Sequence, residues 1–163
     1  MPLIAGLAAA LMAFPIRGQA AAAVQAEYLF SLRGKTKAET IVPVEVAFGR
    51  DGKELYALDS AGAVVLIYGK NGSRIRTLPF PEGLRNIRGL AVDPAGRIYL
   101  ADFATRRVAV MSARGRRLPD LKLPEGPDRL PGKIVLDRTG NVYIADHSRL
   151  EVYVFDGKDG FVR

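Results

Sequence analysis

A unit of about 44 residues recurs in this chain and constrains its fold more than any other feature of the sequence. The copies lie at residues 46–68, 90–111 and 134–155. Each copy has a short apolar run, a turn with a glycine, a second apolar run that ends in aspartate, and a third apolar run. The turn glycines Gly52, Gly96 and Gly140 are spaced 44 residues apart both times. Each copy is therefore expected to form the same structural unit.

The apolar runs are predicted to be β-strands. They are four to six residues long and rich in β-branched and aromatic residues, which favour strands. Between two of them, Pro94 presets φ and Gly96 accepts a positive φ, which predicts a tight turn. The runs are apolar at nearly every position, so both sheet faces are expected to be buried against neighbouring sheets. Several strands per unit and a period in the forties predict an all-β fold built from four-stranded antiparallel propeller blades.

Residues 89–110 and 131–155 closely resemble NHL repeats, and residues 46–68 are a weaker match. The resemblance covers most of residues 43–163 and implies an NHL-type β-propeller, six-bladed when complete. It implies little about activity, because propellers host many unrelated functions. Similar exported bacterial proteins carry a leader, then a tyrosine-containing opening strand such as residues 28–32, then the blades.

The expected organisation is a short N-terminal strand and linker followed by about three blades. The linker covers residues 27–42, and the blades cover residues 43–86, 87–130 and 131–163. Three blades cannot close a ring alone, and each open face of about 500 Å² would forgo about 12 kcal/mol. Two explanations stay open: the chain is a fragment of a longer propeller, or two copies complete one ring. We also expect residues 28–33 to supply the outer strand of the last blade.

Residues 1–26 have the pattern of a secretory signal peptide. Residues 3–14 are apolar and uncharged, and small residues follow at 20–26. A run of this length is short for a membrane span, which needs about 20 residues. No lysine or arginine precedes the run, and the alternative is an uncleaved helix that anchors the protein to a membrane. The expected location is periplasmic or extracellular.

The sequence has almost none of the cysteine and histidine residues that serve as nucleophiles or metal ligands in enzymes. There is no cysteine, which excludes disulfides, thiolate zinc sites and cysteine nucleophiles in this chain. His147 is the only histidine, whereas related propeller lyases hold zinc through several histidines. We expect no cofactor and no metal. The alternative is a metal-dependent lyase or lactonase whose ligands lie in further blades.

Asp59, Asp102 and Asp146 end the second run of each unit. A ring of carboxylates could hold a metal near the central channel, or each aspartate could cap a tight turn by accepting backbone N–H bonds. Recurrence in every blade favours the structural role, because functional residues normally come from unlike positions.

The chain carries a net charge of +7, with ten arginines and only three acids between Arg74 and Arg117. The turns after the second run of each blade and the loops that join blades are expected to share one end of the propeller, which we call the loop face. A nucleic-acid reader concentrates basic residues among aromatics, whereas the arginines here are expected to be divided between both ends. Nucleic acid is therefore not the expected partner, and an RNA-binding NHL module is kept as an alternative.

Binding residues are expected on the loop face, because loops on a rigid scaffold usually carry binding. The candidates are Arg85, Arg88, Arg106, Arg107, Arg129, His147 and Arg149. Leu84, Ile87 and Leu130 could form a small contact patch or could plug the blade edges. The sequence predicts a non-catalytic exported scaffold that binds a protein, peptide or glycan. A membrane is a partner only if the leader is uncleaved, and self-association is a possible way to complete the ring.

Overall fold

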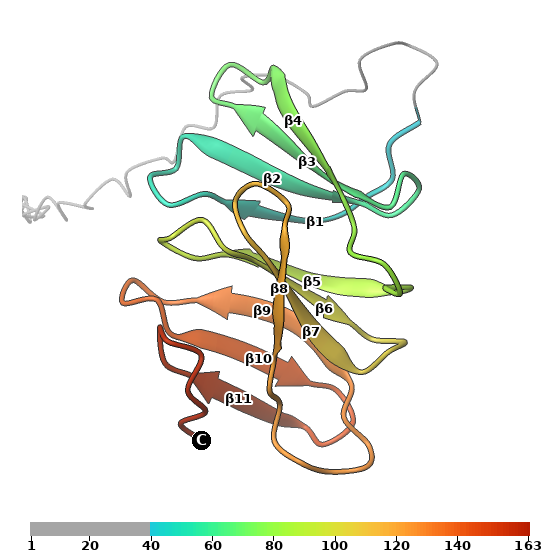
Figure 1. The fold of residues 1–163 in the computed structure, drawn as a ribbon, viewed down its shortest axis with the longest axis vertical. Helices are drawn as coiled ribbons and strands as arrows, with labels where there is room; N and C mark the ends of the chain where they lie inside the picture. Colours follow the sequence, from blue (N-terminus) through green and yellow to red (C-terminus); the bar gives the residue numbers. More distant parts are fainter. Residues whose placement is uncertain (1–39) are drawn as a thin grey trace, which may run out of the picture.

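The computed structural model describes residues 40–163, which form three antiparallel β-sheets (Figure 1). Sheet 1 contains β1 (Pro43–Phe48), β2 (Glu54–Asp59), β3 (Val64–Gly69) and β4 (Arg74–Pro79). Sheet 2 contains β5 (Ile87–Val92), β6 (Ile98–Asp102), β7 (Arg107–Met111) and β8 (Arg117–Leu121). Sheet 3 contains β9 (Pro131–Leu136), β10 (Val142–Asp146) and β11 (Glu151–Phe155).

The predicted all-β fold is confirmed, and every sheet is an up-and-down meander in which consecutive strands pair. The expected signal peptide and the expected outer strand at residues 28–33 lie outside the described residues. In the described part of the chain, no helix is long and apolar enough to cross a membrane.

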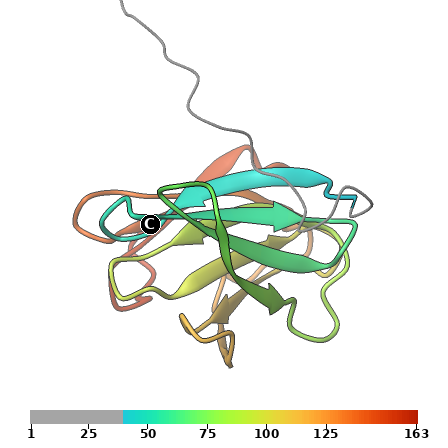
Figure 2. The same cartoon turned by 90° about the horizontal axis from the view of Figure 1, so that it is seen from above.

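The three sheets stack face to face along the longest axis of the molecule (Figures 1 and 2). Their first strands, β1, β5 and β9, lie next to one another, and β5 contacts both of the others. One apolar cluster joins sheets 1 and 2, and it includes Tyr56 and Ile67 from one sheet and Leu100 and Met111 from the other. A second cluster joins sheets 2 and 3 through residues such as Tyr99 and Ile144. Sheet 2 is therefore covered on both faces, as the continuous apolar runs predict.

The strand register shows which residues are equivalent in the three sheets. Tyr56 pairs with Ala47, Tyr99 with Ala91, and Tyr143 with Val135. The three tyrosines are thus one repeated position, on the face that points toward the next sheet. Eight residues lie between Ala47 and Tyr56 and seven lie between Ala91 and Tyr99, so the first turn of sheet 1 holds one extra residue.

Residues 161–163 pair with β11 on the side where sheets 1 and 2 have their fourth strand. Phe161 forms an antiparallel bridge with Phe155. The backbone N–H of Val162 donates to Val154 O at 2.8 Å, and Val154 N–H donates to Arg163 O at 2.7 Å. Phe161 also packs edge-on against the Phe155 ring, with centroids 5.5 Å apart. The third unit therefore follows the same strand order as the first two.

Gly89 on β5 marks the closest approach between two sheets. A side-chain carbon at this position would overlap the carbonyl oxygen of Gly132 in sheet 3 and would lie 3.1 Å from the backbone nitrogen of Ile134. Only glycine allows the two first strands to come this close.

We predict that Gly89→Ala lowers the free energy of unfolding by about 1–3 kcal/mol, because the added methyl group forces sheets 2 and 3 apart. Urea unfolding followed by circular dichroism measures this change. Gly157→Ala is the matched control, because the nearest heavy atoms to the added methyl lie 3.6 Å away. It is expected to change stability by less than about 0.5 kcal/mol. Equal losses in the two variants would contradict the close packing of β5 against β9.

Candidate binding pocket on the loop face

A pocket of about 280 Å³ opens on the loop face between sheets 1 and 2. Its lining comes from β1, from the end of β2 and the turn that follows it, from the loop that joins the two sheets, and from the start of β5. The lining residues are Val44, Leu58, Ser60, Ala63, Phe80, Leu84, Arg85, Asn86, Ile87 and Arg88. Two of the seven predicted binding residues, Arg85 and Arg88, are among them.

The pocket has an apolar floor and a polar rim. Leu58 and Ile87 are buried, and Phe80 and Leu84 pack partly buried against the core cluster between sheets 1 and 2. Leu84 and Ile87 therefore plug the junction between the two sheets and also form the pocket wall. Arg85 and Arg88 are exposed at the rim.

Asp102, at the end of β6, holds the rim in place. Its buried carboxylate accepts the backbone N–H of Arg85 at 2.8 Å and of Asn86 at 3.1 Å. It also accepts the backbone N–H groups of Ala104 and Thr105 in the turn after β6. One carboxylate thus ties the loop that enters sheet 2 to a turn of the same sheet. The backbone of Arg85 and of Asn86 at the rim is fixed by this contact.

The carboxyl group of Asp102 is charged over the ordinary pH range. Burial by itself raises its pKa, but hydrogen bonds from Thr105 and from the backbone of Arg85 and Asn86 outweigh burial. The net effect lowers the pKa of Asp102. The carboxylate form of Asp102 is therefore the form that accepts the backbone hydrogen bonds of the rim.

Asp59 and Asp146 occupy the same place in the other two sheets. Asp59 accepts backbone N–H groups from Val42 at 2.9 Å and from Ala61 at 3.1 Å. Asp146 accepts those of Ser148 and Arg149, and also the hydroxyl of Tyr153 at 2.7 Å. Each aspartate thus binds a turn by backbone hydrogen bonds. Among residues 40–163, no group of three or more histidine or acidic side chains is arranged to hold a metal ion.

The rim arginines have few partners of their own. Arg88 donates from Nε to Asn86 Oδ1 at 3.0 Å, which orients its guanidinium group. In the described part of the chain, no carboxylate lies within ion-pair distance of Arg85 or Arg88. Two positive charges at this rim are therefore available to a ligand.

The other five predicted binding residues lie away from this pocket. Arg106 donates to Pro127 O at 2.9 Å, and Arg129 donates to Pro124 O at 2.6 Å. Arg107 and Arg149 pair with acids, Asp120 and Glu151, both at 3.7 Å. These four arginines thus bind the protein's own loops and strands. The exposed His147 packs against Gly132 and edge-on against Phe103, with ring centroids 6.3 Å apart.

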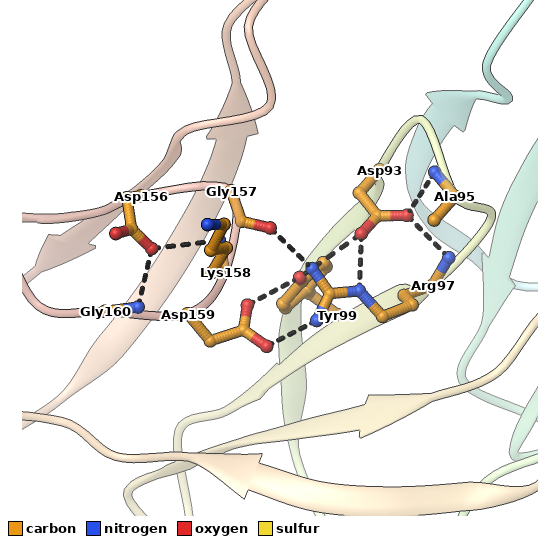
Figure 3. A network of polar contacts seen from close by, with 9 residues as sticks. All are labelled: Asp93, Ala95, Arg97, Tyr99, Asp156, Gly157, Lys158, Asp159 and Gly160. Atoms are coloured by element: carbon orange, nitrogen blue, oxygen red, sulfur yellow. Dashed lines mark hydrogen bonds and ion pairs between the residues drawn. The ribbon is translucent and has the colours of Figure 1, made fainter.

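A second polar network joins sheets 2 and 3 at the opposite end of the strands (Figure 3). Arg97 donates to Asp93 at 2.6 Å, to Gly157 O at 3.2 Å and to Asp159, and the hydroxyl of Tyr99 donates to Asp159 at 2.8 Å. Burial of Tyr99 and its bond to Asp159 raise the tyrosine pKa. The network is internal to the protein and fastens one sheet to the next, so we assign it a structural role.

The sequence analysis did not predict this network, and it named only four of the ten residues that line the pocket. Arg97 and Asp159 are 62 residues apart, and no local pattern relates them. Asn86 and Phe80 carry no motif. The one available signal was the position of residues 84–88 in a long loop directly before the second repeat.

No protein-family model matches the chain, and no curated protein is similar to it in sequence. Solved structures do match. Hydrazine synthase of Kuenenia stuttgartiensis is 18% identical, with a TM-score of 0.59, over 82% of this chain and 38% of that chain. Virginiamycin B lyase from Staphylococcus aureus, solved with quinupristin, is 10% identical, with a TM-score of 0.61, over 78% of this chain and 42% of that chain. A streptogramin B lyase is 14% identical, with a TM-score of 0.60, over 74% of this chain and 39% of that chain.

These similarities show the fold alone, since all three identities are low. The three sheets are β-propeller blades, two with four strands and one with three. The chain spans about two fifths of the length of the structures that it matches.

We predict that Asp102→Ala lowers the free energy of unfolding by about 2 kcal/mol or more, because four backbone N–H groups lose their acceptor. Hydrogen exchange at residues 84–88 should rise together with this loss. Asp51→Ala is the control, because Asp51 is exposed and, among residues 40–163, bonds only to Lys53. Normal exchange at residues 84–88 in Asp102→Ala would contradict the positioning role.

The lowered pKa values of Asp102 and Asp146 predict acid sensitivity. Their contribution is fully present above the unfolded aspartate pKa of about 3.9 and is lost as pH falls through the lower folded pKa. The free energy of unfolding should therefore decline below about pH 4, and less steeply in Asp102→Asn. Urea titrations at several pH values measure this slope. An unchanged slope in the variant would show that Asp102 does not contribute.

Proposed function

We propose that the protein is a non-catalytic, exported propeller scaffold of the NHL type that binds a protein, peptide or glycan through its loop face. The observation that carries the proposal is the pocket between sheets 1 and 2, where Arg85 and Arg88 stand over an apolar floor. The proposed export rests on the leader-like residues 1–26, and the NHL assignment rests on the repeat sequence itself.

The chemistry of the pocket favours a ligand that combines an acidic group with an apolar group. The two guanidinium groups can each bind a carboxylate, and a hydrogen bond to a charged group contributes about 1.5–3 kcal/mol. Phe80 and Leu84 offer apolar contact immediately below the rim. A peptide segment with an acidic residue beside a leucine or an aromatic residue meets both requirements, so we expect a peptide of this type first.

Selection from a random peptide library displayed on phage tests the proposal directly. The protein is expected to enrich peptides in which an acidic residue neighbours an apolar one. Arg85→Ala combined with Arg88→Ala should weaken their binding by at least about tenfold. Arg114→Ala is the matched control, because Arg114 is an exposed arginine in the turn between β7 and β8, at the opposite end of sheet 2.

Two results would contradict the proposal. Peptides that bind the double variant as tightly as the unaltered protein would exclude the pocket rim as the binding site. Stoichiometric zinc or calcium in the purified protein would favour the alternative, a metal-dependent lyase or lactonase. The RNA-binding alternative predicts salt-sensitive RNA binding and a protein that is retained in the cytoplasm, which cell fractionation reports.

A further inference from the structure

One face of sheet 3 is an uncovered copy of a face that is buried in the rest of the molecule. In sheet 2 this face is covered by sheet 3, and its residues are at most 4% exposed: Ala91, Tyr99, Ala101, Val108 and Val110. The strand register gives their equivalents in sheet 3 as Val135, Tyr143, Ala145, Val152 and Val154. Val135 is 49% exposed and Val152 is 56% exposed, whereas Tyr143 and Ala145 are half-buried and Val154 is buried. The side chains have kept the apolar character of a sheet-to-sheet contact.

The matching half of such a contact is uncovered at the other end of the molecule. Val46 and Phe48 on β1 point away from sheet 2 and are 52% and 68% exposed. Their equivalents Leu90 and Val92 in sheet 2 pack against sheet 1. The chain therefore carries an exposed face on sheet 3 and an exposed strand on sheet 1 that correspond to the two sides of a sheet-to-sheet contact.

The rest of that face of sheet 1 is already covered. Ala57, Leu66 and Tyr68 lie on the same side as Val46 and Phe48, and all three are buried. A partner is therefore expected to contact sheet 1 mainly along β1.

The polar groups at the two ends also complement each other. Each internal contact has a guanidinium group that donates to one carbonyl in the last turn of the next sheet: Arg76 to Ala113 O at 2.8 Å, and Arg97 to Gly157 O at 3.2 Å. The equivalent residue in the last turn of sheet 1 is Lys70, which is exposed.

Sheet 3 keeps the acid that sheet 2 has at Asp93 but lacks the guanidinium group that pairs with it. Asn141 stands where sheet 2 has Arg97, and Asp137 accepts hydrogen bonds from Asn141 at 2.8 Å and from Tyr143 at 3.0 Å. Among residues 40–163, neither Asp137 nor Lys70 has an ion-pair partner. A negative group at one end of the stack thus corresponds to a positive group at the other end.

We propose that two copies of this chain associate head to tail, so that sheet 3 of each copy covers β1 of the other and Lys70 of each lies near Asp137 of the other. A twofold axis would relate the two identical contacts. Two copies supply six sheets, twice the three in one chain. Each chain spans about two fifths of the propeller structures that it matches, so a pair approaches the size of one such propeller.

Sedimentation velocity over a range of protein concentrations tests the association. The expected species is a dimer, and Lys70→Glu should raise its dissociation constant roughly tenfold through like-charge repulsion against Asp137. Asn141→Arg should restore association in the Lys70→Glu background, because it places a guanidinium group where sheet 2 has Arg97, near the new acid at position 70. Lys158→Glu is the control, because it reverses an exposed lysine in the equivalent turn of sheet 3.

Cysteine cross-linking tests the relative orientation of the two copies. The sequence has no native cysteine, so every cross-link must come from an introduced one. Gly89 lies against Ile134 inside the molecule, and the equivalent pair between copies is Lys133 with Val46. A mixture of Lys133→Cys and Val46→Cys proteins should form a covalent dimer on oxidation that contains one chain of each. Val135→Cys alone reports an association of two sheet 3 faces instead.

Three outcomes would overturn the proposal. A monomer at every concentration would exclude the association. Rapid cross-linking of Val135→Cys alone, with none in the mixture, would show a different dimer. A dimer that is unaffected by both Lys70→Glu and Val152→Asp would place its contact elsewhere, and circular dichroism confirms that each variant is folded.

Discussion

The structure depends on a simple constraint, which is that each sheet is apolar on both faces and must be covered on both. Sheet 2 meets this condition completely: Tyr99 and Leu100 are adjacent on β6, point to opposite faces and are both fully buried. A lone antiparallel sheet with two apolar faces would expose this area to water, at about 25 cal/mol for each Å². The sheets therefore stabilise one another, and the stack is the folding unit.

The candidate pocket is a consequence of this stacking. A loop joins the last strand of each sheet to the first strand of the next sheet. The repeated aspartate of the next sheet binds the backbone where this loop ends. In sheet 2, Asp102 binds the backbone at Arg85 and Asn86. The same carboxylate that secures the fold thus sets the position of the pocket rim, and the side chains on the rim are free to vary without loss of the fold.

The sequence was sufficient to predict what repeats. The period, the strands, the turn at Asp93–Gly96 and the turn-binding role considered for Asp59, Asp102 and Asp146 all follow from local patterns that recur. The division of the arginines could be foreseen only coarsely. Arg106 and Arg129 are predicted binding residues of the loop face, and both donate to loop carbonyls of the protein itself. A charge on a loop has no pattern that distinguishes binding to a ligand from binding to the protein itself.

The polar contacts between sheets could not be predicted from the sequence, although the apolar burial between sheets could. Arg97 meets Asp159 across the joint between two sheets, and Arg76 meets Ala113 at the preceding joint from a different strand. At both contacts the accepting carbonyl group lies at the same position of the repeat, but the donating arginine lies at a different position. The repeat pattern in the sequence therefore does not predict these hydrogen bonds. The pocket has the same origin, because its walls come from two sheets that only the stacked arrangement brings together.

Native-state hydrogen exchange, resolved by residue, tests the mutual dependence of the sheets most directly. If the stack is one folding unit, the central strands β2, β6 and β10 share one opening free energy, equal to that of global unfolding. If each sheet is stable by itself, the amides of β2 or β10 exchange through separate openings while β6 remains protected. A single common value supports the account, and three independent values would contradict it.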